Sequence, residues 1–327
     1  MSPEKLNILD MKKYYLKAVI LILLICTGTS LFAQQDAQYT QYMYNTISIN
    51  PAYAGSRGVL SVVGLHRSQW VGLPGAPRTQ TLALHSPIGL GRVGLGGSVI
   101  QDELGPAEET YMNIDFSYTI PTSQDGKLSF GLKAGAHLLN VDFNKLNKFT
   151  ENDTRFETNI DNKFSPNVGI GLYYHTPKYY LGLSVPNLLE TNHFDETNVN
   201  VSNNASFLAE ERINYYLMTG YTFTISENVL FKPALLTKLV FGTPLQVDIS
   251  ANFLLYEKLT LGAAYRWSAA FSGLVGFQLS DSLMVGFAYD RETTELGNTK
   301  FNDGSYELLL RFELFKKYSR IITPRFF

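Results

Sequence analysis

The stretch GSYELLLRFELF, residues 304–315, decides the fold of this chain. Its even-numbered positions are apolar, whereas its odd-numbered positions hold most of the polar side chains. Because an extended strand sends successive side chains to opposite faces, this stretch predicts a strand with one greasy and one charged face. The greasy face holds Tyr306, Leu308, Leu310, Phe312 and Leu314, and the other face holds Glu307, Leu309, Arg311 and Glu313.

The same alternation recurs along the chain, most clearly in residues 127–140, 245–253 and 258–267. A soluble antiparallel sandwich also alternates, so alternation alone does not separate the two classes. The segments are ~10 residues long, which is the length that a tilted strand needs to cross a bilayer. Their apolar faces often end in Tyr, Trp or Phe, as in the aromatic girdles at the membrane surfaces. Length and girdle together favour a membrane barrel.

The connections between these segments strengthen that prediction. Short turns, as at 122–126, alternate with a series that contains the long connections 141–164 and 186–210. Bacterial barrels combine short periplasmic turns, long surface loops and an even number of strands. We therefore predict an all-β, antiparallel transmembrane β-barrel of about 14 strands, with ~12 or ~16 as alternatives and both termini periplasmic. The strands start near residues 59, 78, 92, 109, 127, 165, 178, 211, 228, 244, 258, 270, 282 and 304.

Two residue types mark special places in the predicted wall. Pro233 lies inside the ninth strand and has no amide hydrogen for the ladder, so we expect a bulge or break there. Glycine gathers at inward-facing positions. Either these glycines allow the strands to curve, or they leave room for something in the lumen, and we favour curvature. The inward glycines are Gly94, Gly96, Gly131, Gly135, Gly169, Gly171, Gly182, Gly220, Gly262, Gly276 and Gly286.

Charged side chains are also predicted to face inward. A polar lumen is usual in membrane barrels, and such charges either line water or pair with one another. Their presence does not establish transport. The predicted lumen-lining charges are Lys133, Arg212, Lys232, Asp248, Arg266, Glu307, Arg311 and Glu313.

The first 33 residues have the pattern of a secretory signal peptide. Basic residues up to Lys17 precede the wholly apolar run 18–26, and a short stretch ending in Ala33 follows. The run is shorter than the ~20 apolar residues of a spanning helix, so we predict cleavage near Ala33 and export to the outer membrane. The predicted divisions are a signal peptide (1–33), an N-terminal periplasmic or lumenal segment (34–58), the barrel (59–315) and a C-terminal periplasmic tail (316–327).

Composition and motifs exclude several functions. The formal net charge is −2, so no basic field favours a nucleic-acid partner. The one cysteine, Cys26, lies in the predicted signal peptide, so the mature chain has no thiolate for catalysis or metal binding. Adjacent His85 and Ser86 point to opposite faces of a strand and cannot act as base and nucleophile. We find no catalytic, metal-binding or cofactor-binding residues in the sequence and predict that the protein is not an enzyme.

The two flanks of the predicted barrel are too polar for lipid and too aromatic for free exposure to water. Residues 36–55 contain four tyrosines and the turn signals Asn50-Pro51 and Ala54-Gly55. The tail 316–327 carries four cations and ends in two phenylalanines. We expect residues 36–55 to be ordered against the lumen or the periplasmic rim of the barrel.

The two flanks also carry a resemblance to a known family. QYTQYMYN at 38–45, followed by NPAYAGS at 50–56, resembles the opening of the PorP/SprF family. HRSQW at 66–70 and the chain end TPRFF at 323–327 are similar to the same family. The stretch Thr46-Ile47-Ser48 departs from the family pattern. The resemblance implies an outer-membrane component of the type IX secretion and gliding-motility machinery, without enzymatic activity.

What the resemblance implies about partners is specific. It predicts contact with outer-membrane lipid and with a large secreted surface protein that bears a C-terminal type IX sorting domain. As an alternative role, the protein would bridge the outer membrane to periplasmic ring components of the apparatus. The protein would support export or surface attachment of that secreted protein. The barrel alone leaves an alternative open, namely a solute channel or hydrophobic-ligand transporter. The candidate partner-binding residues are Tyr39, Tyr42, Tyr44, Asn45, Asn50, Pro51, Tyr53, Gly55, Trp70, Pro324, Arg325, Phe326 and Phe327.

Overall fold

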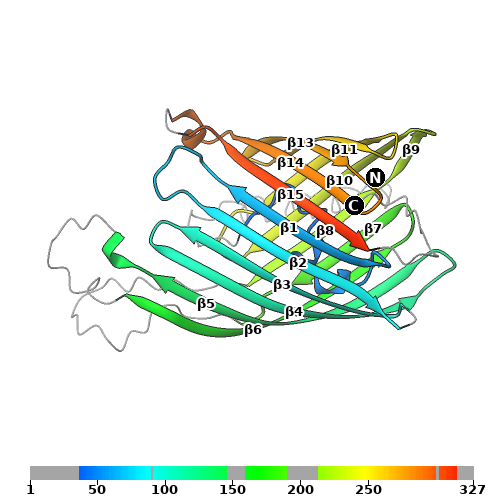
Figure 1. Ribbon diagram of the computed structural model, residues 1–327, viewed down its shortest axis with the longest axis horizontal. Coiled ribbons are helices and arrows are strands. Elements are labelled where there is room, and N and C mark those ends of the chain that lie inside the picture. Colours follow the sequence, from blue (N-terminus) through cyan, green and yellow to red (C-terminus); the bar gives the residue numbers. More distant parts are fainter. Residues whose placement is uncertain (1–36, 90, 146–158, 190–212, 300–301, 315–327) are drawn as a thin grey trace, which may run out of the picture.

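The computed structural model describes residues 37–89, 91–145, 159–189, 213–299 and 302–314, and most of these form β-strands (Figure 1). The helices are short: α2 (Thr46–Ile49), η1 (Pro51–Tyr53), η2 (Phe143–Lys145) and η5 (Glu295–Asn298). The strands are β1 (Leu60–Ser68), β2 (Arg78–Ile88), β3 (Val93–Leu104), β4 (Ala107–Pro121), β5 (Lys127–Val141), β6 (Ile160–His175), β7 (Tyr179–Val185), β8 (Asn214–Tyr221), β9 (Phe223–Ser226), β10 (Val229–Val240), β11 (Gln246–Leu255), β12 (Leu259–Arg266), β13 (Ala270–Gln278), β14 (Leu283–Glu292) and β15 (Ser305–Leu314).

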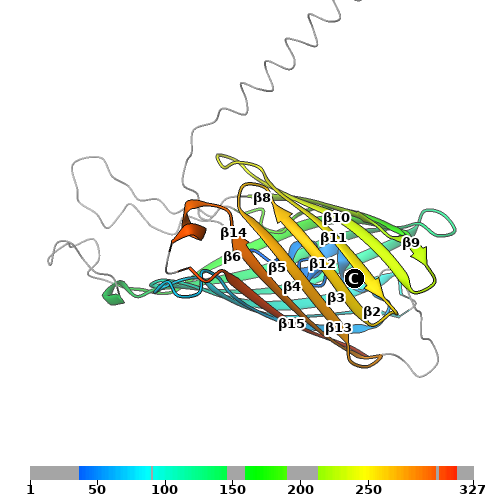
Figure 2. The same cartoon turned by 90° about the horizontal axis from the view of Figure 1, so that it is seen from above.

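Antiparallel pairing closes the sheet into a barrel. The first and last strands, β1 and β15, pair along their whole lengths, from Leu60–Leu314 to Ser68–Tyr306. β8 and β9 both pair with β10, on either side of Thr222, and so occupy one position in the wall. The described residues therefore form a closed antiparallel barrel of 14 strands, which confirms the predicted architecture (Figure 2).

The strand that decides the fold alternates as predicted. From Ser305 to Leu314 each residue of β15 switches between a buried inner face and an exposed outer face. Leu310 is 49% exposed, whereas its neighbour Leu309 is 0% exposed. Large apolar side chains such as Leu132 stay exposed over the whole outer wall. A contiguous apolar surface of this extent is costly in water and favourable against acyl chains, so the outer wall is built to face lipid.

The break predicted at Pro233 falls on the neighbouring strand instead. β10 runs through Pro233, which keeps its place opposite Ala251 of β11. On its other side, the wall strand is interrupted at Thr222 between β8 and β9. The interruption lies between the positions opposite Phe231 and Ala234, and therefore beside Pro233, which cannot donate to the ladder.

The two ends of the barrel differ. One end, called the turn end, carries tight connections such as those between β6 and β7 and between β9 and β10. The other, called the loop end, carries the long connections that follow β1, β5, β7 and β14. This alternation follows the prediction. Which end faces the periplasm remains a prediction.

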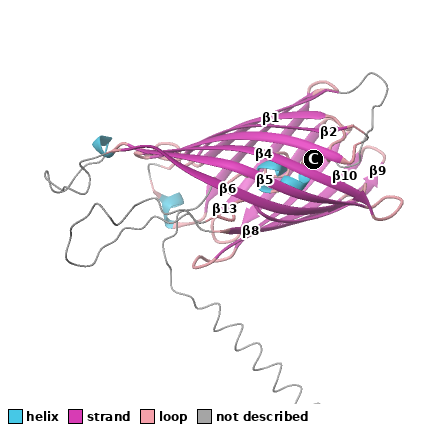
Figure 3. Cartoon of the chain, turned by 90° about the horizontal axis from the view of Figure 1, so that it is seen from below, coloured by secondary structure: helices cyan, strands magenta, loops and turns pink. Residues whose placement is uncertain are grey.

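Residues 37–58, called the lumen segment, fill the interior of the barrel, and α2 and η1 lie within it (Figure 3). Near its start, Gln38 donates a hydrogen bond to Gln246 at the loop end of β11 (3.3 Å). Near its end, Arg57 pairs with Glu313 at the turn end of β15. The expected order against the lumen is confirmed for residues 37–55. The described chain starts in the loop-end half and finishes at the turn end; the periplasmic location of both termini stays a prediction.

Candidate functional site

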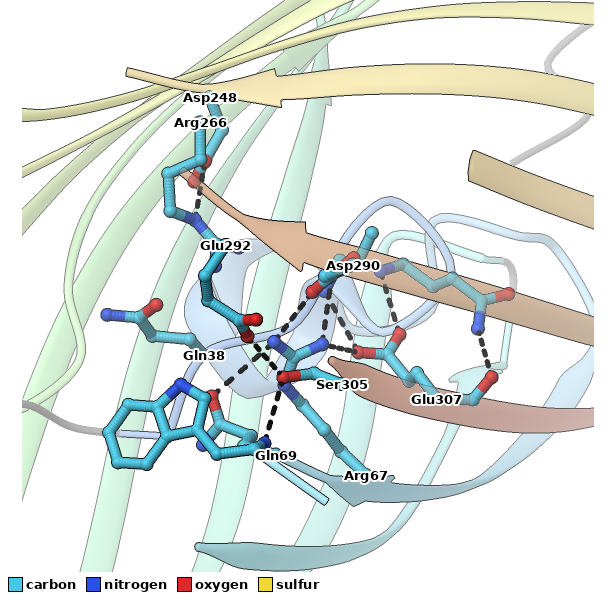
Figure 4. A network of polar contacts seen from close by, with 12 residues as sticks. Gln38, Arg67, Gln69, Asp248, Arg266, Asp290, Glu292, Ser305 and Glu307 are labelled. Carbon is cyan, nitrogen blue, oxygen red and sulfur yellow. Dashed lines mark hydrogen bonds and ion pairs between the residues drawn. The ribbon is translucent and has the colours of Figure 1, made fainter. Parts of the chain in front are cut away.

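Buried charges on β1, β14 and β15 hold the start of the lumen segment (Figure 4). Arg67 Nη2 donates to Asp290 Oδ2 at 2.7 Å, and Nη1 donates to Glu307 Oε2 at 3.1 Å. Glu307 also accepts the backbone amide hydrogens of Thr40 and Gln41, at 2.9 and 2.8 Å. The Thr40 hydroxyl donates to Asp290 Oδ2 at 2.6 Å. These five residues are called the anchor cluster.

Burial makes the anchor cluster energetically demanding. Arg67 is 2% exposed, and Asp290 and Glu307 are each 1% exposed. A buried carboxylate is tolerated when a positive charge and hydrogen-bond donors surround it. Two carboxylates share one guanidinium here, and the backbone amides and hydroxyl of the lumen segment supply further donors. The stability of these wall charges therefore depends on the lumen segment being in place.

Polar side chains fix the middle and the end of the lumen segment. Asn50 Nδ2 donates to the Leu172 carbonyl at 2.9 Å, while its Oδ1 accepts from the Ala52 amide at 2.9 Å. The Ser184 hydroxyl donates to the Ile49 carbonyl at 2.9 Å. Hydrogen bonds between segment and wall therefore run the length of the lumen. Two more lie nearer the turn end, from the Ser117 hydroxyl to the Ala54 carbonyl (2.7 Å) and from the Gly55 amide to His85 Nδ1 (3.1 Å).

Inward glycines make room for the lumen segment. A Cβ added at Gly131 would lie 2.1 Å from the Ala52 nitrogen, and one added at Gly94 would lie 2.1 Å from the Ala54 oxygen. Glycine is required where another stretch of backbone approaches a strand this closely. At these positions the preference for curvature was wrong, and the glycines mark the path of the segment. Gly96, Gly171 and Gly286 likewise face Ile47, Asn50 and Gln41.

The predicted lumen-lining charges that the structure describes are buried inside the barrel. Most of them lie in ion pairs, so the inner wall is a compensated network rather than a row of charges along open water. Arg212 lies outside the described residues. Besides the anchor cluster, the pairs are Lys133–Asp115 (2.9 Å), Arg266–Asp248 (2.7 Å), Arg311–Glu313 (3.9 Å) and Arg57–Glu313, and Lys232 lies 4.8 Å from the ring centroid of Tyr180.

The candidate partner-binding residues fall into three groups. Trp70 is partly exposed at the loop end, where its backbone nitrogen donates to Ser305 Oγ at 3.2 Å. Residues 324–327 lie outside the described residues. The other candidates belong to the lumen segment, and all of them except the partly exposed Gly55 are buried. These buried candidates are Tyr39, Tyr42, Tyr44, Asn45, Asn50, Pro51 and Tyr53.

Sequence reasoning missed most of the anchor cluster. Glu307 was expected to face inward, but Arg67 and Asp290 were not identified. Both residues lie at inward-facing positions of their strands. In β1 every second residue from Val63 through Leu65 to Arg67 is buried, and Asp290 continues the same alternation in β14. Both faces of β1 carry apolar residues, such as Val62 on the outside and Val63 on the inside, so its sequence does not reveal which face Arg67 is on. No local pattern shows which residues of the lumen segment meet these charges.

The adjacent residues His85 and Ser86 lie on opposite faces of β2. His85 accepts from the Gly55 amide, whereas the Ser86 hydroxyl donates to the Pro87 carbonyl at 3.2 Å on the other face. In the described part of the chain, no three His, Cys, Asp or Glu side chains converge as metal ligands. Among those same residues, no helix combines the length and apolarity needed to cross a membrane.

Fold and lumen together define a class of protein, a membrane β-barrel whose interior is filled by its own N-terminal segment. Residues 31–312 match the family described as type IX secretion system membrane protein PorP/SprF, and the chain belongs to that family. Among curated proteins, no sequence matches the chain.

Several solved barrels are similar to the chain in architecture. They include the CymD monoaromatic hydrocarbon channel (12% identity, 88% of this chain and 92% of that chain, TM-score 0.45) and a Pseudomonas aeruginosa FadL homologue (11%, 88% and 96%, 0.42). The NanC porin is another (10%, 78% and 100%, 0.41). The family match, rather than these likenesses, identifies the chain.

Proposed function

We propose that the protein acts in type IX secretion as an outer-membrane barrel that binds large secreted proteins bearing a C-terminal sorting domain. In this role it supports their export or their attachment to the cell surface. Membership of the PorP/SprF family supports the secretion part of the proposal. The filled lumen is the observation that favours protein binding over the passage of solutes.

A solute channel or hydrophobic-ligand transporter needs a path through the barrel. The lumen segment crosses that path from loop end to turn end and is bonded to the wall at both ends. Beside it lies a cavity of about 60 Å³ lined by residues such as Tyr39, Lys133 and Tyr216. That volume holds only a few water molecules. The interior is thus built as a packed core, and the surfaces left for partners are at the ends.

The loop end offers the better-prepared surface. Short turns face the periplasm in bacterial barrels, so the loop end is assigned to the cell surface, where a secreted protein arrives. Two backbone bonds tie Trp70 and its neighbours to the connection before β15, from Val71 to the Gly304 carbonyl (2.9 Å) and from Asp303 to the Val71 carbonyl (2.8 Å). A partly exposed tryptophan held on a fixed loop is the kind of residue that dominates interface energies.

The experiment is copurification of the tagged protein from its native membrane, comparing Trp70→Ala with Tyr256→Ala. Tyr256 is an exposed aromatic residue at the turn end and serves as the matched control. Loss of a tryptophan hot spot costs about 2 kcal/mol or more, ~30-fold in affinity. We expect Trp70→Ala to lose the secreted sorting-domain protein and Tyr256→Ala to retain it. Retention by Trp70→Ala, or recovery of no such protein by the unmodified barrel, contradicts the proposal.

A further inference from the structure

The outer wall has a groove centred on Gly64. This residue lies in the middle of β1 on the outward face, between Leu310 of β15 and Leu82 of β2. A Cβ added at Gly64 would meet no atom within 4 Å, so the position is open. The groove has a volume of about 480 Å³, and Val99 and Leu308 complete its apolar lining. An apolar trough therefore lies on the lipid-facing surface.

The loop-end half of the groove is polar. His66 stands opposite Gln80, and Gln80 stands opposite Gln101, so the three form one row across β1, β2 and β3. On each strand this row lies two residues nearer the loop end than the row formed by Gly64, Leu82 and Val99. All three polar side chains line the groove.

The neighbours of the polar row show its depth in the membrane. Leu308 of β15 stands opposite His66 and continues the row as an apolar residue. One row nearer the loop end, Tyr306 stands opposite Ser68 and is exposed, as a member of an aromatic girdle is. The polar row therefore lies one step inside that girdle residue. Within the protein, His66 Nε2 lies 3.1 Å from Ser68 Oγ, and Gln101 Nε2 donates to Glu108 Oε1 at 2.7 Å. Among the described residues, the Gln80 side chain makes no such bond, and a polar group at this depth is costly unless a headgroup satisfies it.

We propose that this groove binds one phosphate-bearing outer-membrane lipid. One acyl chain lies over Gly64, and the headgroup meets His66, Gln80 and Gln101. Lipid is the occupant because the groove opens on the wall that faces the bilayer, with apolar lining below and hydrogen-bonding groups above. Arg78, exposed on the same face two residues nearer the loop end than Gln80, supplies a positive charge for the phosphate. Glu103 stands opposite Arg78 on β3, so the headgroup meets charges of both signs. The inference depends on the barrel spanning a membrane and not on its role in secretion.

Native mass spectrometry of the detergent-purified barrel tests the site, with lipid A and phosphatidylethanolamine added separately as probes. The unmodified barrel should retain one molecule of at least one probe. Gly64→Leu places a side chain in the open space over Gly64 and should lose that one-lipid species. Gly273→Leu, at an outward glycine of β13 that is also open, should keep it. Folding of each variant is checked by its gel mobility before and after heating.

A second variant separates the headgroup contact from the acyl-chain contact. His66→Leu with Gln80→Leu leaves the trough intact, so it should lower retention of the phosphate-bearing probe relative to diacylglycerol. Equal retention by the unmodified barrel and Gly64→Leu overturns the proposal, as does equal loss in Gly64→Leu and Gly273→Leu. A photocrosslinker at position 64 that captures only protein in native membranes also overturns it.

Discussion

The inner and outer walls of the barrel are made by the same strands under different constraints, as two adjacent residues of β15 show. Leu310 faces outward and is half exposed, whereas Leu309 faces the lumen and is fully buried. The outer wall has only to be apolar, because lipid adapts its shape to any side chain. The inner wall has to fit one particular segment, so its glycines, charges and hydroxyls are placed one by one.

The outer wall therefore packs against lipid without fixed partners, whereas the inner wall packs against particular residues of the lumen segment. Glu307 accepts bonds from Thr40 and Gln41, which lie more than 260 residues away in the chain. A substitution on the outer wall changes contact with a fluid. A substitution on the inner wall changes contact with the lumen segment, so it should be felt throughout the interior.

Deletion of residues 37–55 should have the largest effect. The outer wall is untouched, so the barrel should still insert, while removal of the lumen segment opens the interior to water. We expect planar-bilayer conductance to appear in the deletion variant and to be absent from the intact protein. The same variant should fail to support export of its partner. Equal conductance of the two proteins would refute the filled-lumen account.

Leucine at an inward glycine should come next. In Gly131→Leu the new side chain collides with the backbone of the lumen segment, which cannot rotate away as a side chain can. We expect destabilisation at or above the ~1–3 kcal/mol typical of overpacking, or expulsion of the segment. Gly273→Leu, on the outer wall, should be neutral. Thermal unfolding in detergent, with protease sensitivity of the segment, measures both; matching melting curves would contradict the contrast.

Removal of the shared cation should rank third. Arg67→Met leaves Asp290 and Glu307 buried without their guanidinium, which typically costs about 3–5 kcal/mol. Glu307→Gln keeps one of the two acceptor oxygens, so one backbone amide of the segment loses its partner; the loss should cost about 1.5–3 kcal/mol, the value of a charge-assisted hydrogen bond. Denaturant titration gives both values. The account fails here if Arg67→Met proves no worse than a substitution of an exposed arginine such as Arg78→Met.

The adjacent leucines give the smallest and cleanest comparison. Leu309→Ala should leave a cavity against the packed interior and cost about 2–5 kcal/mol. Leu310→Ala removes the same atoms from the outer wall, where lipid or detergent refills the space, so its cost should be well below that. The two unfolding free energies are measured in one detergent. Equal costs would mean that the lumen is not tightly packed.

The sequence predicted the outer wall well and the inner wall poorly, for a physical reason. Alternation in β15 and β5 reports the side that faces lipid, because period-two apolarity is a local signal. The occupant of the lumen is determined by contacts between residues that are far apart in the sequence. The glycines pointed to it, yet Gly94 and Gly131 look the same whether they allow curvature or admit a backbone. Arg67 and Asp290 were missed because their partner carboxylate and hydroxyl come from distant segments.

A disulfide across the lumen tests the central claim most directly. The Ile47 side chain lies against Gly96, where an added Cβ would be 2.4 Å from Ile47 Cδ1, and the chain has no cysteine after Cys26. The paired variant Ile47→Cys with Gly96→Cys should form an intramolecular disulfide in native membranes, seen as a mobility shift on non-reducing gels. The control pairs Ile47→Cys with Leu95→Cys, which faces lipid, and should stay reduced. A disulfide in the control, or none in the test pair, would contradict a lumen filled by the N-terminal segment.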